Sequence, residues 1–180
     1  MDKALSSLEL YKLFENKIKI IPYKRLVDFD TIEEVFDPYR VVFILYETKP
    51  FFGHWTVICT DSTTNYFFDP YGFKPDEELK FTSKEYRKAN NMWLPYLSYL
   101  LIKSPKKLVY NKYKLQDITD KSVATCGRWC ALYAYFYDQT SIKEFAETFL
   151  NSNITPDQAI TIITSFIWIK NSSYYIERTK

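Results

Sequence analysis

Three apolar segments within residues 40–69 constrain the fold more than any other feature of this sequence. The first, "RVVFILYE" at 40–47, is an unbroken run of β-branched, aliphatic and aromatic residues, which is typical of a strand buried on both faces. The next two, "HWTVICT" at 54–60 and "NYFFD" at 65–69, flank the polar "DSTT" and predict an antiparallel hairpin. A β-sheet is therefore expected at the centre of the fold.

Helical patterns lie before and after this central region. Apolar residues at helical spacing predict helices at 4–16, from about 30, at 82–104 with a kink or break at Pro95, and at 126–139, 141–150 and 155–170. Thr155 is the expected cap of the last helix, and residues 106–116 alternate like a strand. Strands in the middle with helices on either side predict an α+β fold, and 180 residues predict one domain, 1–180.

Charge and hydropathy exclude several classes of protein. The formal charge of +2 gives no global argument for nucleic-acid binding. No apolar run approaches the roughly 18 residues of a membrane span, and the N-terminus is charged from its second residue, unlike a signal peptide. We therefore expect a soluble chain in a reducing compartment, where three cysteines do not indicate a disulfide framework.

Two scarce residue types are placed together. The single histidine, His54, follows Gly53, while Gly72 follows "FFDPY" and Gly127 follows Cys126. Glycine serves where the backbone turns sharply or is closely approached. These three glycines are either three ordinary turns or the surroundings of one site.

The cysteines allow a metal site or a disulfide in principle, and neither interpretation fits well. Cys59, Cys126, Cys130 and His54 give the four ligands of a structural zinc. His54 and Cys59, however, are five residues apart on one predicted strand and point to opposite faces. A bond between Cys126 and Cys130 suits neither the compartment nor the side-chain directions of a helix. No metal or cofactor is expected.

A nucleophile is the better interpretation of "ATCGRWCA" at 124–131. Cys126 stands at the predicted start of a helix, where free N–H groups and the helix dipole favour thiolate over thiol. Cys130, one turn inside, is expected to be a buried and inert thiol. A cysteine nucleophile needs a base, which can only be His54, and a group that orients this base.

Asp69 is the best candidate for that orienting group. It is fifteen residues from His54, so a hairpin centred between Asp61 and Ser62 would place the two residues directly opposite each other. Their Cβ atoms would then be roughly 5 Å apart. The polar stretch is centred nearer Thr63, so this register requires a bulge or an irregular turn. Asp61, together with Asp76 and Asp37, is a weaker candidate.

An acyl-transfer site also needs donors for a developing oxyanion. The backbone N–H of Cys126 supplies one. Gln116, the only Gln or Asn between Asn111 and Cys126, is a candidate for a second.

In order along the chain, "GHWTVI", "YFFDPYGF", a glutamine and "TCGRWC" resemble the adenovirus maturation protease (adenain) and the related Ulp1-type cysteine peptidases. Within this group they are most similar to maturation proteases of virophages and Maverick elements, of the mavirus type. The resemblance implies a central mixed or antiparallel sheet flanked by helices, with the catalytic cysteine at the N-terminus of a buried helix. It also implies His54 as base, Asp69 as its orienter, Cys126 as nucleophile and Gln116 as oxyanion donor.

Two features depart from that family. Gln116 precedes Cys126 by ten residues, where six or seven are usual, so "DITDKSV" must accommodate an insertion. In adenovirus a peptide activator is disulfide-linked shortly after a Ser-Pro pair, and alignment on Ser104 and Pro105 places Leu108 at that position. A covalently attached peptide is therefore not expected. The resemblance allows DNA as a cofactor, which the net charge does not support.

The resulting prediction is a monomeric cysteine endopeptidase that cleaves capsid or other structural precursors, in the host cytoplasm and the virion. A deubiquitinase or deSUMOylase of the same fold is the first alternative. A catalytically inactive scaffold protein, in which these residues are structural, is the second.

Overall fold

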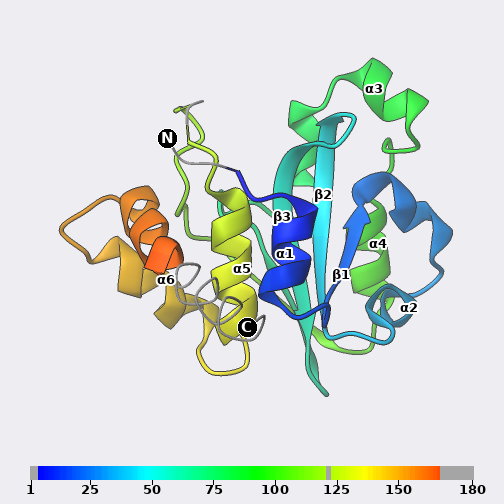
Figure 1. The fold of residues 1–180 in the computed structure, drawn as a ribbon. Helices are drawn as coiled ribbons and strands as arrows, with labels where there is room; N and C mark the ends of the chain where they lie inside the picture. Colours follow the sequence, from blue (N-terminus) through cyan, green and yellow to red (C-terminus); the bar gives the residue numbers. More distant parts are fainter. Residues whose placement is uncertain (1–3, 121–122, 167–180) are drawn as a thin grey trace, which may run out of the picture.

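A five-stranded mixed sheet forms the centre of the protein in the computed structural model, which describes residues 4–120 and 123–166 (Figure 1). Its strands, in spatial order, are β1 (Lys19–Pro22), β2 (Val41–Lys49), β3 (Phe52–Thr60), β4 (Thr64–Phe68) and β5 (Lys107–Tyr110). The three central strands pair antiparallel, while β1 and β5 join the edges in parallel. The predicted α+β class with a mixed sheet and flanking helices is confirmed.

Helices cover both faces of the sheet (Figure 1). One face carries α1 (Ser7–Leu13), α5 (Cys126–Phe136) and, outside them, α6 (Ile142–Leu150), with Trp55 and Val57 of β3 among its buried side chains. The other face carries α2 (Ile32–Phe36), α4 (Tyr96–Lys103) and a 3-10 helix, η1 (Tyr23–Asp28), with Ile58 of β3 in the core. Side chains that alternate along β3 thus belong to two separate cores, as the period of a strand requires.

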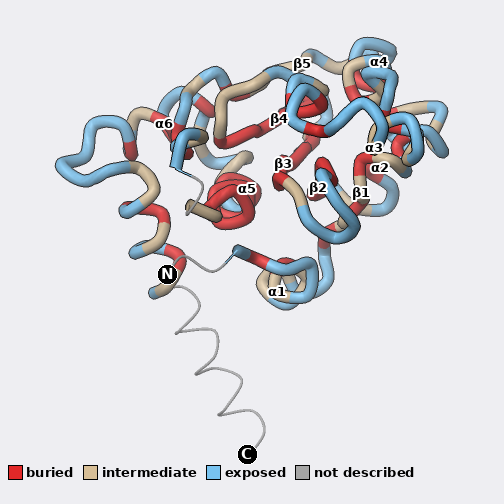
Figure 2. Tube along the Cα trace, turned by 90° about the horizontal axis from the view of Figure 1, so that it is seen from above, coloured by how far each residue is buried: buried red, intermediate tan, exposed pale blue. Residues whose placement is uncertain are grey.

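Helix α5 begins at the candidate nucleophile and is enclosed by the rest of the fold. Its residues from Cys126 to Ala134 are all buried, and Figure 2 shows this helix between the sheet and the outer helix α6. A helix buried around its circumference can place its first residue precisely, because packing fixes both its direction and its rotation. No helix of the described residues is long and apolar enough to cross a membrane.

Local capping explains where several helices begin. Ser6 and Glu9 form a capping box at the start of α1, and Ser141 with Glu144 does the same for α6. Residues 156–166 are helical, and the Thr155 hydroxyl accepts a hydrogen bond from the Gln158 N–H at 3.3 Å, as predicted for this cap. The expected continuation to residue 170 lies outside the described residues.

Two expectations from the sequence are wrong in detail, and one strand was missed. The break expected at Pro95 within residues 82–104 is present, but it is wider than expected: α3 (Lys84–Ala89) ends before Asn91, which adopts a positive φ of 54°, and α4 begins directly after Pro95. The strand expected over 106–116 ends at Tyr110, where the Asn111 amide bonds the carbonyl oxygens of Asp69 and Tyr113 and turns the chain. Strand β1 was not predicted, since four residues give too short a pattern.

Candidate active site

His54 and Asp69 form a buried pair at one end of the sheet. His54 lies near the start of β3, and Asp69 follows the last residue of β4. The His54 Nε2 atom is 3.0 Å from Asp69 Oδ1, and the two residues are 8% and 0% exposed. Asp69 Oδ1 also accepts the backbone N–H of Tyr71 at 2.8 Å, which fixes the carboxylate in the turn after β4.

The hairpin register that brings the two residues together differs from the one predicted. Thr60 pairs with Asn65, so the turn is centred between Ser62 and Thr63 and not between Asp61 and Ser62. This register extends to place Asp69 opposite Thr56, two residues from His54, so the pair is diagonal and not directly opposite. The predicted shared face is nevertheless correct, because residues two apart lie on one face and long side chains span the diagonal.

Cys126 is the first residue of α5, and its neighbours hold this helix end in place. The preceding residue, Thr125, does not cap the helix with its side chain but donates its hydroxyl to Asp157. The first N–H groups of α5 are therefore left without a side-chain cap and can receive a negatively charged group.

Gly127 has a packing role next to Cys126. A Cβ atom at this position would lie 2.9 Å from Leu5 Cβ and 3.2 Å from Trp55 Cδ1. The Trp55 indole in turn donates to the Leu5 carbonyl at 3.1 Å. Gly127 thus lets α5 approach β3 and the N-terminal segment closely, which brings the start of α5 to the start of β3, where His54 lies.

The other two glycines also have local causes. A Cβ atom on Gly53 would lie 1.9 Å from the Tyr46 carbonyl oxygen, so β2 and β3 could not pair as they do with any larger residue. Gly72 adopts a φ of +77° in the turn after Asp69. The sequence left two interpretations of these glycines open. Ordinary turns and close packing account for all three of them, although the three glycines also flank the same site.

The electrostatics of His54 favour its protonated form. Burial by itself lowers the pKa of His54, but the charge and hydrogen bond of Asp69 outweigh it and hold this pKa well above 6.5. A hydrogen bond with the Cys126 side chain and the charge of Glu78 act in the same direction. The Tyr71 ring stacks on the imidazole, with centroids 4.2 Å apart and planes at 12°. His54 is therefore paired, stacked and poised to hold a proton.

The remaining cysteines are placed differently from Cys126. Cys59, Cys126 and Cys130 are all free thiols. Burial raises the pKa of both Cys59 and Cys130 well above the usual value, so both are inert at neutral pH. Cys130 donates its S–H to the Trp55 carbonyl oxygen at 3.2 Å. Among the described residues no ligand cluster contains a cysteine.

Gln116 is buried near the site and incompletely satisfied. Its Nε2 group makes only long contacts, 3.4 Å to the Tyr71 hydroxyl and 3.5 Å to the Val123 carbonyl oxygen, and its Oε1 atom has no hydrogen-bond partner among the described residues. Tyr71 stacks on His54, so the structure connects Gln116 to the His54–Asp69 pair through this one ring. A weakly held amide donor is free to reorient toward a ligand.

Two polar residues at the site were not predicted from the sequence. Asp157 accepts hydrogen bonds from Thr125 and Trp129 of the α5 start and from the Asp117 N–H at 2.8 Å. Glu78, in the 3-10 helix η2 (Glu77–Phe81), is buried beside His54 and Asp69. Neither residue stands in a recognisable motif, because each reaches the site only through the tertiary fold.

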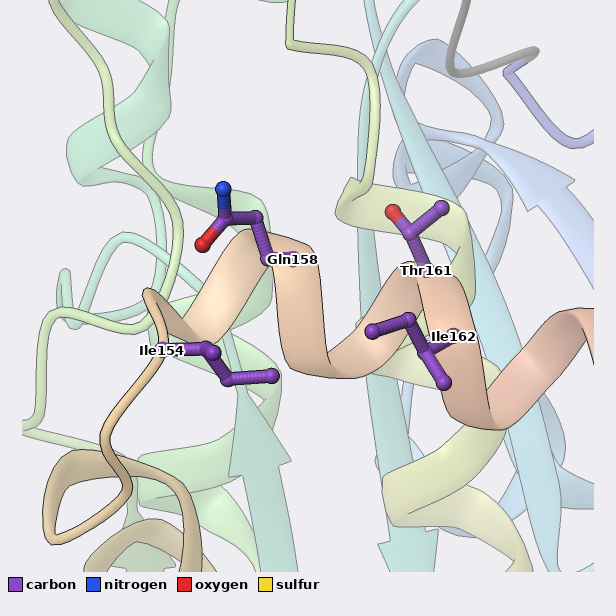
Figure 3. A pocket seen from close by; sticks show the side chains of 4 residues that line it. All are labelled: Ile154, Gln158, Thr161 and Ile162. Carbon is purple, nitrogen blue, oxygen red and sulfur yellow. The ribbon is translucent and has the colours of Figure 1, made fainter.

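A shallow depression on the outside of the molecule is separate from this chemistry. It lies along the 156–166 helix and is lined by Ile154, Gln158, Thr161 and Ile162 (Figure 3). None of these side chains is a nucleophile of the kind described above or a titratable group. The chemically equipped site is therefore the one at the start of α5.

Comparison with known proteins gives one clear relative. No family model matches the chain. The "Uncharacterized protein V9" of Sputnik virophage is 36% identical over 165 residues, which cover 89% of this chain and 94% of that protein. Among solved structures, the ASFV pS273R protease aligns with 88% of this chain at 14% identity and a TM-score of 0.47. The chain spans 65% of that protease's length. On the extent of the first match, the chain belongs to the family of virophage protein V9.

Proposed function

We propose that the protein is a cysteine endopeptidase in which Cys126 is the nucleophile, His54 the general acid and base, and Asp69 the group that orients His54. One observation supports this most strongly. The only histidine of the chain is buried between a carboxylate 3.0 Å from its Nε2 atom and the side chain of a cysteine at a helix N-terminus. These are the parts that activate a thiol for covalent catalysis, each from a different element of the fold.

The reaction depends on the two nitrogens of His54. Because Nε2 faces Asp69, Nδ1 is the nitrogen left to take the Cys126 proton. The sulfur then attacks the peptide carbonyl carbon, and the C–N bond breaks as His54 returns the proton to the leaving amine. A thioester remains on Cys126. Water, deprotonated by His54, attacks this thioester and releases the new carboxyl end and the thiol.

Backbone and amide donors can stabilise the oxyanion that develops in both steps. The N–H of Cys126 lies at the uncapped start of α5, where the helix dipole favours negative charge. Gln116 is the candidate for a second donor, since its amide is buried near Tyr71 and held only by long contacts.

The proposed substrates are structural precursor proteins of a virion, cleaved in the host cytoplasm and the virion. Membership in a virophage protein family supports a viral setting.

The test is cleavage of the capsid proteins encoded with this chain. The wild-type protein and the variants Cys126→Ala and Cys130→Ala are incubated with these capsid proteins and, in parallel, with ubiquitin and SUMO fusion proteins. We expect wild type and Cys130→Ala to cut the capsid proteins at defined positions, while Cys126→Ala cuts nothing. Preferential cleavage of the fusions would make the deubiquitinase interpretation correct, and equal activity of Cys126→Ala would refute the proposed nucleophile.

A further inference from the structure

Three potential metal ligands converge at the imidazole of His54. One ring nitrogen of His54, one carboxylate oxygen of Asp69 and one of Glu78 all lie within 4.8 Å of one another. All three residues are buried. They come from β3, the turn after β4, and η2, so the sheet and the helix that covers its end hold them together.

Two of these groups have an unused oxygen. Asp69 Oδ2 and Glu78 Oε1 are buried and have no hydrogen-bond partner among the described residues, and their residues are 0% and 4% exposed. A buried carboxylate oxygen without a donor costs free energy, so native proteins usually satisfy it with a proton, a donor or a metal ion. The site therefore has acceptor capacity that the described side chains do not fill.

The cluster holds two carboxyl groups against one imidazole. Among the described residues, its one ion pair is between His54 and Asp69, at 3.0 Å. Lys80, the nearby lysine, is occupied elsewhere: its ammonium pairs with Glu77 at 2.9 Å and lies 3.6 Å from the centre of the Phe73 ring.

We propose that His54, Asp69 and Glu78 form a Zn²⁺ site whose occupation reversibly inhibits the protein. The inhibition rests on the proposed peptidase function, whereas the binding of the metal does not. This ligand set differs from the cysteine-based zinc site considered and rejected from the sequence.

The ligand chemistry suits zinc better than a hard cation. One imidazole and two carboxylates are ordinary zinc ligands at bond lengths of about 2.0–2.2 Å, which puts neighbouring ligand atoms about 3.4 Å apart. Ligand atoms already within 4.8 Å need only a small closure to reach this geometry. Calcium requires six or more oxygen ligands, which three side chains cannot supply. A water molecule can take the fourth position.

Inhibition results from the position of the proton on the imidazole. Zinc binds Nε2 in place of the proton now shared with Asp69, so binding releases that proton. The one remaining proton of the neutral ring is then on Nδ1, the nitrogen that should accept the Cys126 proton. His54 can no longer act as the base, and Asp69 no longer orients it.

The test measures zinc binding without requiring activity. ZnCl₂ is titrated against a chromophoric chelator in the presence of Cys126→Ala, which removes the alternative thiol–imidazole chelate. We expect one zinc per chain. A second substitution, Glu78→Gln, in this Cys126→Ala protein should weaken zinc binding at least about tenfold, because the loss of even an indirect partner of a metal ligand costs that much affinity. Glu77→Gln, a neighbouring residue outside the cluster, is the matched control and should leave binding unchanged.

Inhibition is then measured in the protein with Cys126 present. Zinc should inhibit wild type and Glu77→Gln at the same concentration, EDTA should restore activity, and Glu78→Gln should require at least about ten times more zinc. Gln keeps the size and shape of the Glu78 side chain, and a thermal melt checks that this variant is folded. If it is not, Asp69→Asn in the Cys126→Ala protein replaces it in the binding assay, with the same expected loss.

Three results separate the interpretations. If Cys126→Ala binds no zinc, or binds it equally with and without Glu78→Gln, the proposed site is wrong. The carboxyl pair then shares a proton, and any zinc inhibition comes from the Cys126–His54 chelate. If Cys126→Ala binds zinc in a Glu78-dependent way but wild type cleaves no protein, the metal site stands and the proposed function fails.

Discussion

Replacing Asp69 by Asn is the sharpest perturbation of the proposed catalytic group. Asp69 Oδ1 accepts from both His54 and the Tyr71 N–H, and the residue is fully buried. An Asn side chain that keeps its oxygen in the Oδ1 position retains both hydrogen bonds but leaves His54 without a charged acceptor. If the side chain turns over, its NH₂ group faces both Nε2 and the Tyr71 N–H. In that second case the proton of neutral His54 moves to Nδ1, where it blocks transfer from Cys126.

The expected loss of catalytic activity is the one that follows when a general base holds its proton on the wrong nitrogen. We predict a decrease of kcat/KM by on the order of 10²- to 10⁴-fold, which corresponds to about 2.7–5.4 kcal/mol in the activation barrier. Folding should survive. The lost charge-assisted hydrogen bond is worth about 1.5–3 kcal/mol, and this is offset by removal of a buried charge that repels Glu78.

The pH dependence gives a second readout. Asp69 raises the pKa of His54, so the imidazolium is present below that pKa and is lost as the pH rises through it. Asp69→Asn lowers the pKa of His54, and the alkaline limb of the kcat/KM profile should move to lower pH. The profile is measured with a peptide that the wild type cleaves.

Asp61→Asn is the matched control for this experiment. Asp61 lies at the other end of the same hairpin, where its Oδ1 atom accepts the N–H groups of Thr63 and Thr64 at 2.7 Å. Its replacement should lower stability without changing the pH profile. The role proposed for Asp69 is refuted if Asp69→Asn, folded by circular dichroism, keeps wild-type kcat/KM and profile, or if Asp61→Asn reproduces its loss.

Four further changes have defined outcomes. Gln116→Ala should lower kcat by about 10²- to 10³-fold with a smaller effect on KM if the amide is an oxyanion donor, and a rise in KM alone would exclude that role. Asp157→Ala removes three hydrogen bonds and should lower the free energy of unfolding by about 2 kcal/mol in urea titrations, with reduced kcat because the α5 start loosens. Gly127→Ala forces a Cβ atom to 2.9 Å from Leu5 Cβ and should cost about 1–3 kcal/mol by overpacking, partly offset by about 1 kcal/mol of helix propensity, seen as a lower Tm. Cys130→Ala should leave activity close to that of wild type, since this thiol only packs and donates to a carbonyl.

The residues that carry the proposed chemistry were accessible from the sequence because they are scarce or oddly placed. A chain with one histidine leaves a single candidate for the base, and Cys126 stands at a helix start that periodicity alone predicts. Strand parity then selected Asp69 correctly as a residue on the face of His54. The first inference depends on composition and the other two on local spacing, and a sequence displays both directly.

The exact register of the hairpin was not accessible in the same way. The Asp61 side chain caps the turn and shifts its centre by one residue, so that His54 and Asp69 meet diagonally. Glu78 and Asp157 were missed for a different reason. Each lies far from Cys126 in the chain and reaches the site only when η2 and the 156–166 helix pack, which no local pattern encodes.

The proposed function depends above all on Cys126, activated by His54, being the reactive thiol of this protein. Limited labelling with iodoacetamide at neutral pH, followed by peptide mapping of all three cysteines, measures this reactivity. We expect rapid modification of Cys126 alone, and loss of this selectivity in His54→Ala, while Cys59 and Cys130 stay unlabelled in the folded protein. Equal labelling of Cys59 or Cys130, or unchanged labelling of Cys126 in His54→Ala, would contradict the proposed activation.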